Sequence, residues 1–154
     1  MWPIAAALLM AAATGCATHR QAPPPSRGQT CIWPLPAGFS TITSEYGCRN
    51  GAHHGVDVRA PKGTPVYAVA DGQVTFTGEA RGYGKLVRIA HVGGIESLYA
   101  HLKTFETKAG RNVRQGCCIG KVGATGNSNG FHLHFEMRRN GTPINPGRYL
   151  PPPR

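Results

Sequence analysis

Residues 131–137 alternate between apolar side chains and side chains that can bind metals or move protons. In an extended strand His132, His134 and Glu136 lie on one face, because successive side chains point to opposite faces. The two imidazoles are then about 7 Å apart along the strand, so both can point at one small site. The other face is apolar and is expected to belong to the core. Its members are Phe131, Leu133, Phe135 and Met137.

A second candidate segment covers residues 53–58. If it is extended, His53, Gly55 and Asp57 share a face, and the glycine between the two polar residues has no side chain to block a bound ion. His54 points away from that face. The opposite face carries Val56 and Val58.

Together the two segments supply the ligands of a catalytic zinc ion. Neutral imidazole and carboxylate are good zinc ligands, and three protein ligands plus water form a catalytic site, whereas a fourth protein ligand closes it. A His-x-His pair alone is more often a surface or core feature. The combination is stronger because the chain has only two aspartates. We therefore expect one Zn²⁺ per chain.

The elements that position these side chains are expected to be strands. Gly contributes 21 and Pro 13 of the 154 residues, and both destabilise helix interiors. Residues 66–70 and 73–77 are candidate strands of one hairpin around an Asp71-Gly72 turn. Residues 86–91 and 95–101 predict a second hairpin, and alternation places four side chains of its second strand on one face. They are Ile95, Ser97, Tyr99 and His101. The sequence predicts a mainly β, mostly antiparallel sheet.

The chain is strongly basic. Lys and Arg number 17 against 7 Asp and Glu, a formal net charge of +10 at pH 7, which attracts polyanions. We expect no nucleic acid partner, because the basic residues are scattered and no run combines them with aromatic platforms for bases. An anionic membrane surface or the cell wall fits the charge, and so does a solvated basic surface without a dedicated partner.

The first residues indicate export. Residues 2–14 are uncharged and rich in Ala and Leu, a length that suits a signal peptide and is too short to span a membrane. They lead into Ala13-Thr14-Gly15-Cys16, which resembles the lipobox of bacterial lipoproteins and implies a lipid anchor on Cys16. Secretion without a lipid and a buried N-terminal helix are the alternatives.

Four segments follow from this interpretation. We expect a signal peptide over residues 1–15, a lipidated, Pro-rich tether over residues 16–30, a folded domain over residues 31–150 and a loose tail over residues 151–154. Ala17 after the lipidated cysteine resembles outer-membrane sorting in a host with two membranes. The expected location is the outer membrane, facing the periplasm, and the alternative is a soluble secreted or periplasmic protein.

Four more cysteines lie in the expected domain: Cys31, Cys48, Cys117 and Cys118. In an exported chain they allow three disulfide pairings. A bridge between the adjacent Cys117 and Cys118 is disfavoured by strain, which favours bridges from Cys31 and Cys48 to this pair, and the sequence does not decide the pairing. The CxxC spacing of a four-cysteine zinc site is missing.

The ordered motifs resemble those of the lysostaphin and LytM-like zinc metallopeptidases, family M23 of peptidoglycan endopeptidases, over residues 33–150. The motifs are Tyr46-Gly47-Cys48-Arg49, His53-His54-Gly55-Val56-Asp57, Gly63-Thr64-Pro65-Val66, Ala70-Asp71-Gly72, Tyr99-Ala100-His101-Leu102, Gly126-Asn127-Ser128 and His132-Leu133-His134-Phe135-Glu136. The resemblance implies an antiparallel sheet of the lysostaphin/LytM type with an active-site groove. By position it implies that the zinc ligands are His53, Asp57 and His134.

The resemblance also implies two catalytic histidines that are not ligands, His101 and His132. Because no HExxH motif supplies a glutamate, His132 is expected to act as general base and then as acid toward the leaving amine. His101 is expected to orient the water or stabilise the oxyanion, and the two roles can be exchanged. His54 is interpreted as a groove-edge residue and His91 as structural.

Three features are candidate walls of the groove or, equally, ordinary loop residues: Arg49, residues 81–84 and residues 127–131. Asn129 and Phe131 depart from the Thr and Pro common in the family just before His132, which would reshape that lip.

The implied function is zinc-dependent endopeptidase activity on peptide cross-links of peptidoglycan, in a chain expected to be a monomer. Either a D-alanyl-diaminopimelate link or a glycine bridge could be cleaved. One alternative is a non-catalytic peptidoglycan-binding module that activates an amidase, although such relatives lose zinc ligands that this chain has. Another is a structural metal-binding or polyanion-binding protein.

Overall fold

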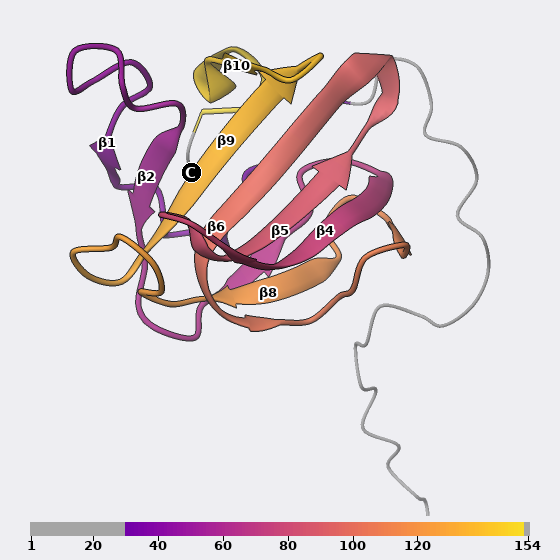
Figure 1. The fold of residues 1–154 in the computed structure, drawn as a ribbon, viewed down its shortest axis with the longest axis horizontal. Helices are drawn as coiled ribbons and strands as arrows, with labels where there is room; N and C mark the ends of the chain where they lie inside the picture. Colours follow the sequence, from indigo (N-terminus) through magenta and orange to yellow (C-terminus); the bar gives the residue numbers. More distant parts are fainter. Residues whose placement is uncertain (1–29, 153–154) are drawn as a thin grey trace, which may run out of the picture.

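The structure, a computed structural model, describes residues 30–152 (Figure 1). The expected signal peptide and Cys16 lie outside the described residues, as do residues 16–29 of the expected tether and residues 153–154 of the tail. Within the described range no helix has the length and apolarity needed to cross a membrane.

Strands and short turns build the described part of the chain. The strands are β1 (Ile42–Ser44), β2 (Val56–Arg59), β3 (Pro65–Tyr67), β4 (Gly72–Ala80), β5 (Gly84–Ala90), β6 (Ile95–Phe105), β7 (Asn112–Val113), β8 (Cys118–Val122), β9 (His132–Arg139) and β10 (Thr142–Ile144). Two single-turn 3₁₀ helices, η1 (Val92–Gly94) and η2 (Pro146–Arg148), follow β5 and β10.

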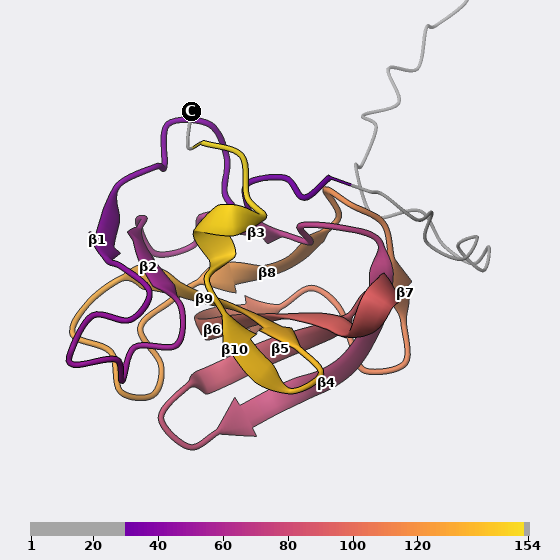
Figure 2. The same ribbon diagram turned by 90° about the horizontal axis from the view of Figure 1, so that it is seen from above.

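The strands pair antiparallel in the order β1-β2-β9-β6-β5-β4-β7, and β8 pairs with both β3 and β6. In Figure 1 the long strands β9, β6, β5 and β4 lie side by side, with β2 and β1 beyond β9. Figure 2 shows β3 and β8 on one side of this central layer. The predicted mainly β fold with an antiparallel sheet is therefore confirmed.

The core lies against the apolar face of β2 and β9. Val58, Leu133, Phe135 and Met137 are all 0% exposed, and Val56 is also buried. These positions alternate along the two strands as predicted. Each such side chain stabilises the fold by about 1.5–3 kcal/mol when fully buried, so the alternation fixes which face of β2 and β9 is left for the polar groups.

One of the two predicted hairpins is confirmed and the other is wrong. β5 and β6 pair as expected, but β3 pairs with β8, and β4 pairs with β5 and β7. The residues between β3 and β4 do not form a hairpin turn, because they bond to residues 115–117 instead. Ala68 exchanges backbone hydrogen bonds with that chain, and the Asp71 carboxylate accepts one from the Gln115 N–H at 2.7 Å.

The expected bridges from Cys31 and Cys48 are also wrong, since both carry free thiols, as does Cys118. The backbone around Cys31 bonds to Tyr67 and Val69 on one side of residues 67–69, whereas Cys117 bonds to Ala68 on the other. Cys31 and Cys117 therefore lie two strand spacings apart, about 9.5 Å. This exceeds the separation of roughly 7 Å between Cα atoms that a disulfide tolerates.

Candidate active site

Strand pairing brings the first two candidate ligands together. In the β2–β9 register Asp57 lies opposite His134, and both point to the face away from the core. His53 precedes β2 in a tight loop, in which the His53 N–H donates to the Cys48 carbonyl and the Gly47 N–H donates to the His53 carbonyl. The loop folds His53 back over the strand pair.

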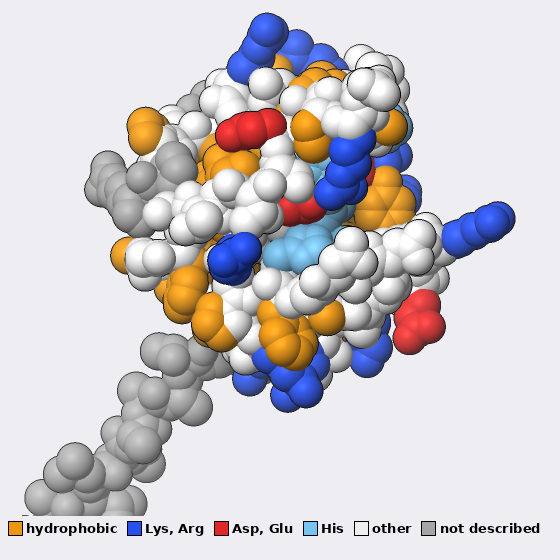
Figure 3. All heavy atoms as spheres, turned by 90° about the vertical axis from the view of Figure 1, so that its left-hand side faces the viewer, with side chains coloured by type: hydrophobic (Ala, Val, Ile, Leu, Met, Phe, Trp, Pro, Cys, Tyr) orange, Lys and Arg blue, Asp and Glu red, His pale blue; other side chains and the backbone are white. Residues whose placement is uncertain are grey.

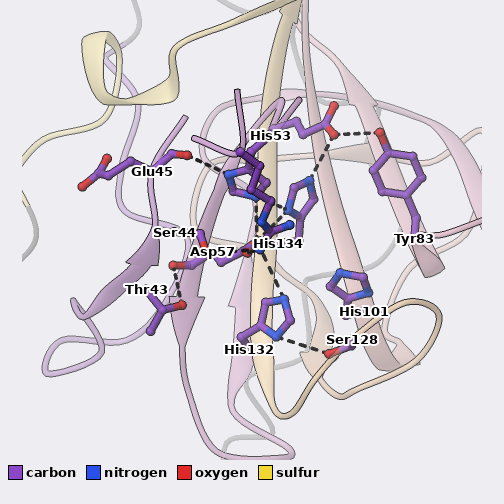
Figure 4. A network of polar contacts seen from close by, with 12 residues as sticks. Thr43, Ser44, Glu45, His53, Asp57, Tyr83, His101, Ser128, His132 and His134 are labelled. Carbon is purple, nitrogen blue, oxygen red and sulfur yellow. Dashed lines mark hydrogen bonds and ion pairs between the residues drawn. The ribbon is translucent and has the colours of Figure 1, made fainter. Parts of the chain in front are cut away.

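Three potential ligand atoms converge there (Figure 4). His53 Nε2 lies 3.1 Å from Asp57 Oδ1 and 3.3 Å from His134 Nδ1, and His134 Nδ1 lies 2.7 Å from Asp57 Oδ1. All three residues are buried. The sequence prediction named these three residues, and the structure places them in one cluster.

In His53 and in His134, the ring nitrogen that faces away from the cluster has a hydrogen-bond acceptor of its own. His53 Nδ1 lies 2.7 Å from the Glu45 carbonyl oxygen, and His134 Nε2 lies 3.0 Å from Glu136 Oε1. Each acceptor requires a proton on the nitrogen that faces it, so a neutral ring presents its lone pair to the cluster. Two imidazole nitrogens and one carboxylate oxygen form a donor set suited to zinc, and three ligands leave a position open for water.

The sequence prediction did not assign a role to Glu136, although it noted the residue on the polar face. Glu136 is 1% exposed and accepts from His134, from the Tyr83 hydroxyl at 2.7 Å and from Arg138 at 2.8 and 3.0 Å. Burial opposes its ionisation, but these donors outweigh burial and lower the pKa of Glu136 to about 2. Burial and the bond to Glu136 raise the pKa of Tyr83 to about 12.

The cluster itself favours a negative aspartate and a positive charge beside it. Burial opposes ionisation of Asp57, but the hydrogen bond and charges of the surrounding imidazoles hold its pKa well below the usual range. Burial likewise opposes protonation of His134, but its bonds to Asp57 and Glu136 raise its pKa to about 9. A divalent cation that takes the three ligand atoms displaces a proton, so its uptake is coupled to pH.

His132 and His101 lie beside the cluster on the same face (Figure 4). Their ring centroids are 4.8 Å apart, and His132 Nε2 lies 3.7 Å from Asp57 Oδ1. His132 Nδ1 is 3.0 Å from the Gly130 carbonyl and His101 Nδ1 is 2.7 Å from the Thr125 carbonyl. With Nδ1 donating to a carbonyl, each neutral ring keeps a lone pair on Nε2.

A β-bulge in β6 directs His101 to this face. Tyr99 packs in the core against Phe135, and strict alternation would place His101 on the same face of the strand as Tyr99, as the sequence analysis expected. That expectation is wrong because β6 advances three residues, from Tyr99 to Leu102, while β5 advances two. His101 takes a φ of 59° at this point, and bulges of this kind re-aim side chains next to active sites.

A groove of about 1060 Å³ surrounds the cluster. Figure 3 shows the histidines at the bottom of a hollow, with Lys and Arg side chains on either side. The predicted walls line it: Arg49, Tyr83, Asn127 and residues 129–131. His54 also lines the groove, at an exposed position. His91 is instead held by Asp71 and Ser97 outside the groove, as a structural residue should be.

Two details differ from the expectations. Phe131 is 48% exposed on the groove rim and not in the core, because β9 begins only at His132. Gly55 does not face the ligand cluster. A Cβ there would lie 2.3 Å from the Phe135 carbonyl oxygen, so this glycine lets the chain approach β9 closely.

Comparisons with known proteins agree with this geometry. The sequence model described as peptidase family M23 matches residues 51–146. The chain is 49% identical over 118 residues to the DD-carboxypeptidase/endopeptidase Mpg of Neisseria meningitidis serogroup B, which covers 72% of this chain and 27% of that protein.

Two proteins of Escherichia coli are also similar. The uncharacterized lipoprotein YgeR is 38% identical over 130 residues, covering 83% of this chain and 50% of its own. The murein hydrolase activator NlpD is 38% identical over 123 residues, covering 79% and 31%. The chain thus spans between 27% and 50% of the length of these relatives and Mpg.

Solved structures share the fold. A zinc containing peptidase from Vibrio cholerae superposes with a TM-score of 0.71 at 30% identity, over 76% of this chain and 39% of that one. The antimicrobial peptidase lysostaphin from Staphylococcus simulans superposes with a TM-score of 0.67 at 32% identity, over 72% and 49%. Since the family match covers more than half of the sequence and the fold is of the lysostaphin type, the chain belongs to peptidase family M23.

Proposed function

We propose that the protein is a zinc-dependent endopeptidase that hydrolyses peptide cross-links of bacterial peptidoglycan. The observation that carries this proposal is the convergence of His53 Nε2, Asp57 Oδ1 and His134 Nδ1 at the floor of a groove that also holds His101 and His132. The similarity to Mpg, which is named as a carboxypeptidase and endopeptidase, supports the reaction class.

His53, Asp57 and His134 would hold the ion, which when bound polarises a peptide carbonyl and makes water nucleophilic near neutral pH. Hydrolysis forms a C–O bond from water and breaks the C–N bond, so a proton must pass from water to the leaving nitrogen. His132 Nε2 accepts that proton and delivers it, because Nδ1 is committed to the Gly130 carbonyl and Nε2 faces the cluster.

His101 orients the attacking water. Burial lowers the pKa of His101, although its bond to the Thr125 carbonyl opposes that effect, so the ring is neutral at pH 7. A neutral ring with Nδ1 donating can accept a hydrogen bond from water at Nε2 but cannot donate one from Nε2 to an oxyanion. This favours the orienting role over the oxyanion role.

The test uses intact peptidoglycan sacculi and mass spectrometry of the released fragments. The zinc-loaded protein should release un-cross-linked peptides, a chelator should stop release, and added zinc should restore it. His132→Ala should keep zinc while losing most of the hydrolysis. Fragment release that persists at full rate in a zinc-free preparation would contradict the proposal.

The similarity to NlpD, named as a murein hydrolase activator, supports a second function: a non-catalytic module that binds peptidoglycan and activates an amidase. The complete His/Asp/His cluster favours the enzyme instead. Addition of the protein to a purified amidase distinguishes the activator from the endopeptidase. An activator raises amidase turnover even when its Asp57 is replaced by Ala.

We also propose that the protein is anchored by a lipid on Cys16 to the outer membrane, facing the periplasm. The lipobox-like residues before Cys16 and the similarity to YgeR, named as a lipoprotein, support this location. A Cys16→Ser variant should then leave the membrane fraction for the soluble one, whereas an unlipidated protein would fractionate alike with either residue.

A further inference from the structure

Among residues 30–152, two arginines line the groove, Arg49 and Arg59, and only the Arg49 side chain has a partner there. Arg49 Nη2 lies 3.4 Å from Asp57 Oδ2 and 3.3 Å from Ser44 Oγ. Among the described residues no hydrogen bond or ion pair reaches the Arg59 guanidinium, which is exposed. Arg59 therefore places in the groove a positive charge that no described side chain balances.

Strand register gives Arg59 a defined place on the groove floor. Along β2 it lies two residues after Asp57 and on the same face, about 7 Å further along the strand. Across the strand pair Asp57 faces His134 and Arg59 faces His132, with Cβ atoms of such pairs about 5 Å apart. His132 thus lies beside Arg59 on the neighbouring strand, on the same side of the Asp57–His134 pair, and the Arg59 backbone N–H donates to the Thr41 carbonyl.

The groove offers a ligand positive charge and little negative charge. In the described part of the chain, Asp57 and Glu136 are the only carboxylates that line it, and both are buried and already accept several hydrogen bonds. A cation without a partner in such a groove is complementary to a ligand carboxylate, which an arginine can bind through two parallel hydrogen bonds.

We propose that Arg59 binds a free carboxylate of the substrate, carried by the residue that supplies the nitrogen of the scissile bond. The inference rests on the proposed function, in which His132 delivers a proton to that nitrogen. The residue beyond the nitrogen then extends over His132 toward Arg59. A D-alanyl-diaminopimelate link has a carboxylate on the carbon that bears this nitrogen, whereas a glycine bridge has none, so the groove is specific for the former.

The test compares two soluble cross-linked peptides that differ only at this carboxylate, free in one and amidated in the other. The zinc-loaded protein should cleave the free acid with a kcat/KM at least about tenfold higher, the scale of a charged hydrogen bond. Arg59→Ala should lower kcat/KM about tenfold for the free acid, mainly through KM, and leave the amide unchanged. Arg59→Lys should recover part of the loss.

Arg114→Ala is the matched control, since it removes the same charge at an exposed position outside the groove and should change neither rate. Equal cleavage of the two peptides by the unmodified protein, or equal losses on both in Arg59→Ala, would overturn the inference. Calorimetric binding of the amine-terminated product peptide, as acid or amide, supplies a readout without turnover. Arg59-dependent preference for the acid in a protein that cleaves neither peptide would keep the inference and refute the proposed endopeptidase.

Discussion

Four imidazoles meet at the groove floor, and each has one nitrogen held by a protein acceptor. His53, His132 and His101 use the backbone carbonyls of Glu45, Gly130 and Thr125, and His134 uses the Glu136 carboxylate. Because every anchor is an acceptor, every neutral ring turns a lone pair toward the same small volume. The site is thereby organised for a cation and for proton transfer before any ligand arrives.

Replacement of a ligand is the most direct test at this scale. Asp57→Ala removes the carboxylate to which both His53 and His134 are bonded, so zinc content should fall from one per chain to near zero and hydrolysis should fall by more than about a hundredfold. Metal analysis after gel filtration measures the first effect. His54→Ala, which removes an exposed imidazole beside His53, is the control for zinc content. Full zinc occupancy in Asp57→Ala would show that Asp57 is no ligand.

The Glu136 carboxylate should matter almost as much although it does not touch the cluster centre. Glu136→Gln keeps the shape but replaces one acceptor oxygen by an NH₂ group, so the side chain can no longer accept from both Tyr83, which bonds to Oε1, and Arg138, which bonds to Oε2. Outer partners of a ligating histidine contribute about 10- to 100-fold in metal affinity, so zinc affinity should fall within that range in a competition assay. Glu106→Gln, in an exposed pair with Lys121, should leave it unchanged. Equal affinities in both variants would mean that Glu136 serves only the fold.

Residue spacing together with the family resemblance predicted the four histidines and Asp57 as site residues, but not the anchors that orient them. Three of the four anchors are backbone carbonyls, which every residue type supplies, so no residue pattern marks Glu45, Thr125 or Gly130 as partners. Glu136 was visible by alternation with His134. Its role was not, because the Tyr83 and Arg138 contacts that hold it depend on the packing of other strands.

At the scale of elements, close contact between the β4–β5 loop and the β8–β9 loop sets the position of His101. The Asn127 N–H donates to the Gly82 carbonyl, the His101 N–H donates to the Tyr83 carbonyl, and the Thr125 hydroxyl binds the Lys85 N–H. The bulge in β6 was therefore not predictable from β6 alone, since the alternation of Ser97, Tyr99 and His101 reads as a regular strand. The neighbouring loops decide where the alternation breaks.

Gly126→Ala tests this loop contact. A Cβ at Gly126 would lie 2.3 Å from the Gly84 nitrogen, and its φ of 72° also disfavours a side chain. Gly63→Ala is the control, because φ is 88° there and nothing lies within 4 Å. Both variants incur the backbone cost of about 1–2 kcal/mol, but Gly126→Ala should lose about 1–3 kcal/mol more in denaturant unfolding because the loops must separate. It should also lower kcat, since Thr125 holds His101. Equal losses of stability would refute the contact.

At the scale of the whole molecule, the Gly and Pro content and the predicted hairpins sufficed to predict the sheet class, and the alternation of β2 and β9 predicted the face that carries the site. The partners of β3 and the state of the cysteines were not predictable in this way. The pairing of β3 depends on how the chain near residues 113–118 returns to Ala68 and Asp71, a contact between segments almost fifty positions apart. A local turn signal such as Asp71-Gly72 cannot predict a strand pairing that is set by residues far away in the sequence.

A buried polar chain links that region to the central strands and makes stability depend on pH. His91 Nδ1 lies 2.8 Å from the Asp71 carbonyl and Nε2 lies 2.7 Å from Ser97 Oγ, which is 3.0 Å from the Tyr99 hydroxyl. Burial lowers the pKa of His91, although the Asp71 carbonyl and the charges of Asp71 and Glu96 oppose that effect.

Because the folded protein holds His91 neutral, the unfolded chain binds the proton first as pH falls. The contribution of His91 is therefore complete above the unfolded pKa of about 6.5 and is lost as pH falls toward the lower folded value, with a slope of at most about 1.4 kcal/mol per pH unit. His91→Asn keeps a donor near Nδ1 but cannot titrate. Denaturant unfolding between pH 7 and 5 should show the free energy of unfolding declining more steeply in the unmodified protein than in His91→Asn. Parallel profiles would mean that His91 is protonated in the folded protein as readily as in the unfolded chain, and would contradict this account.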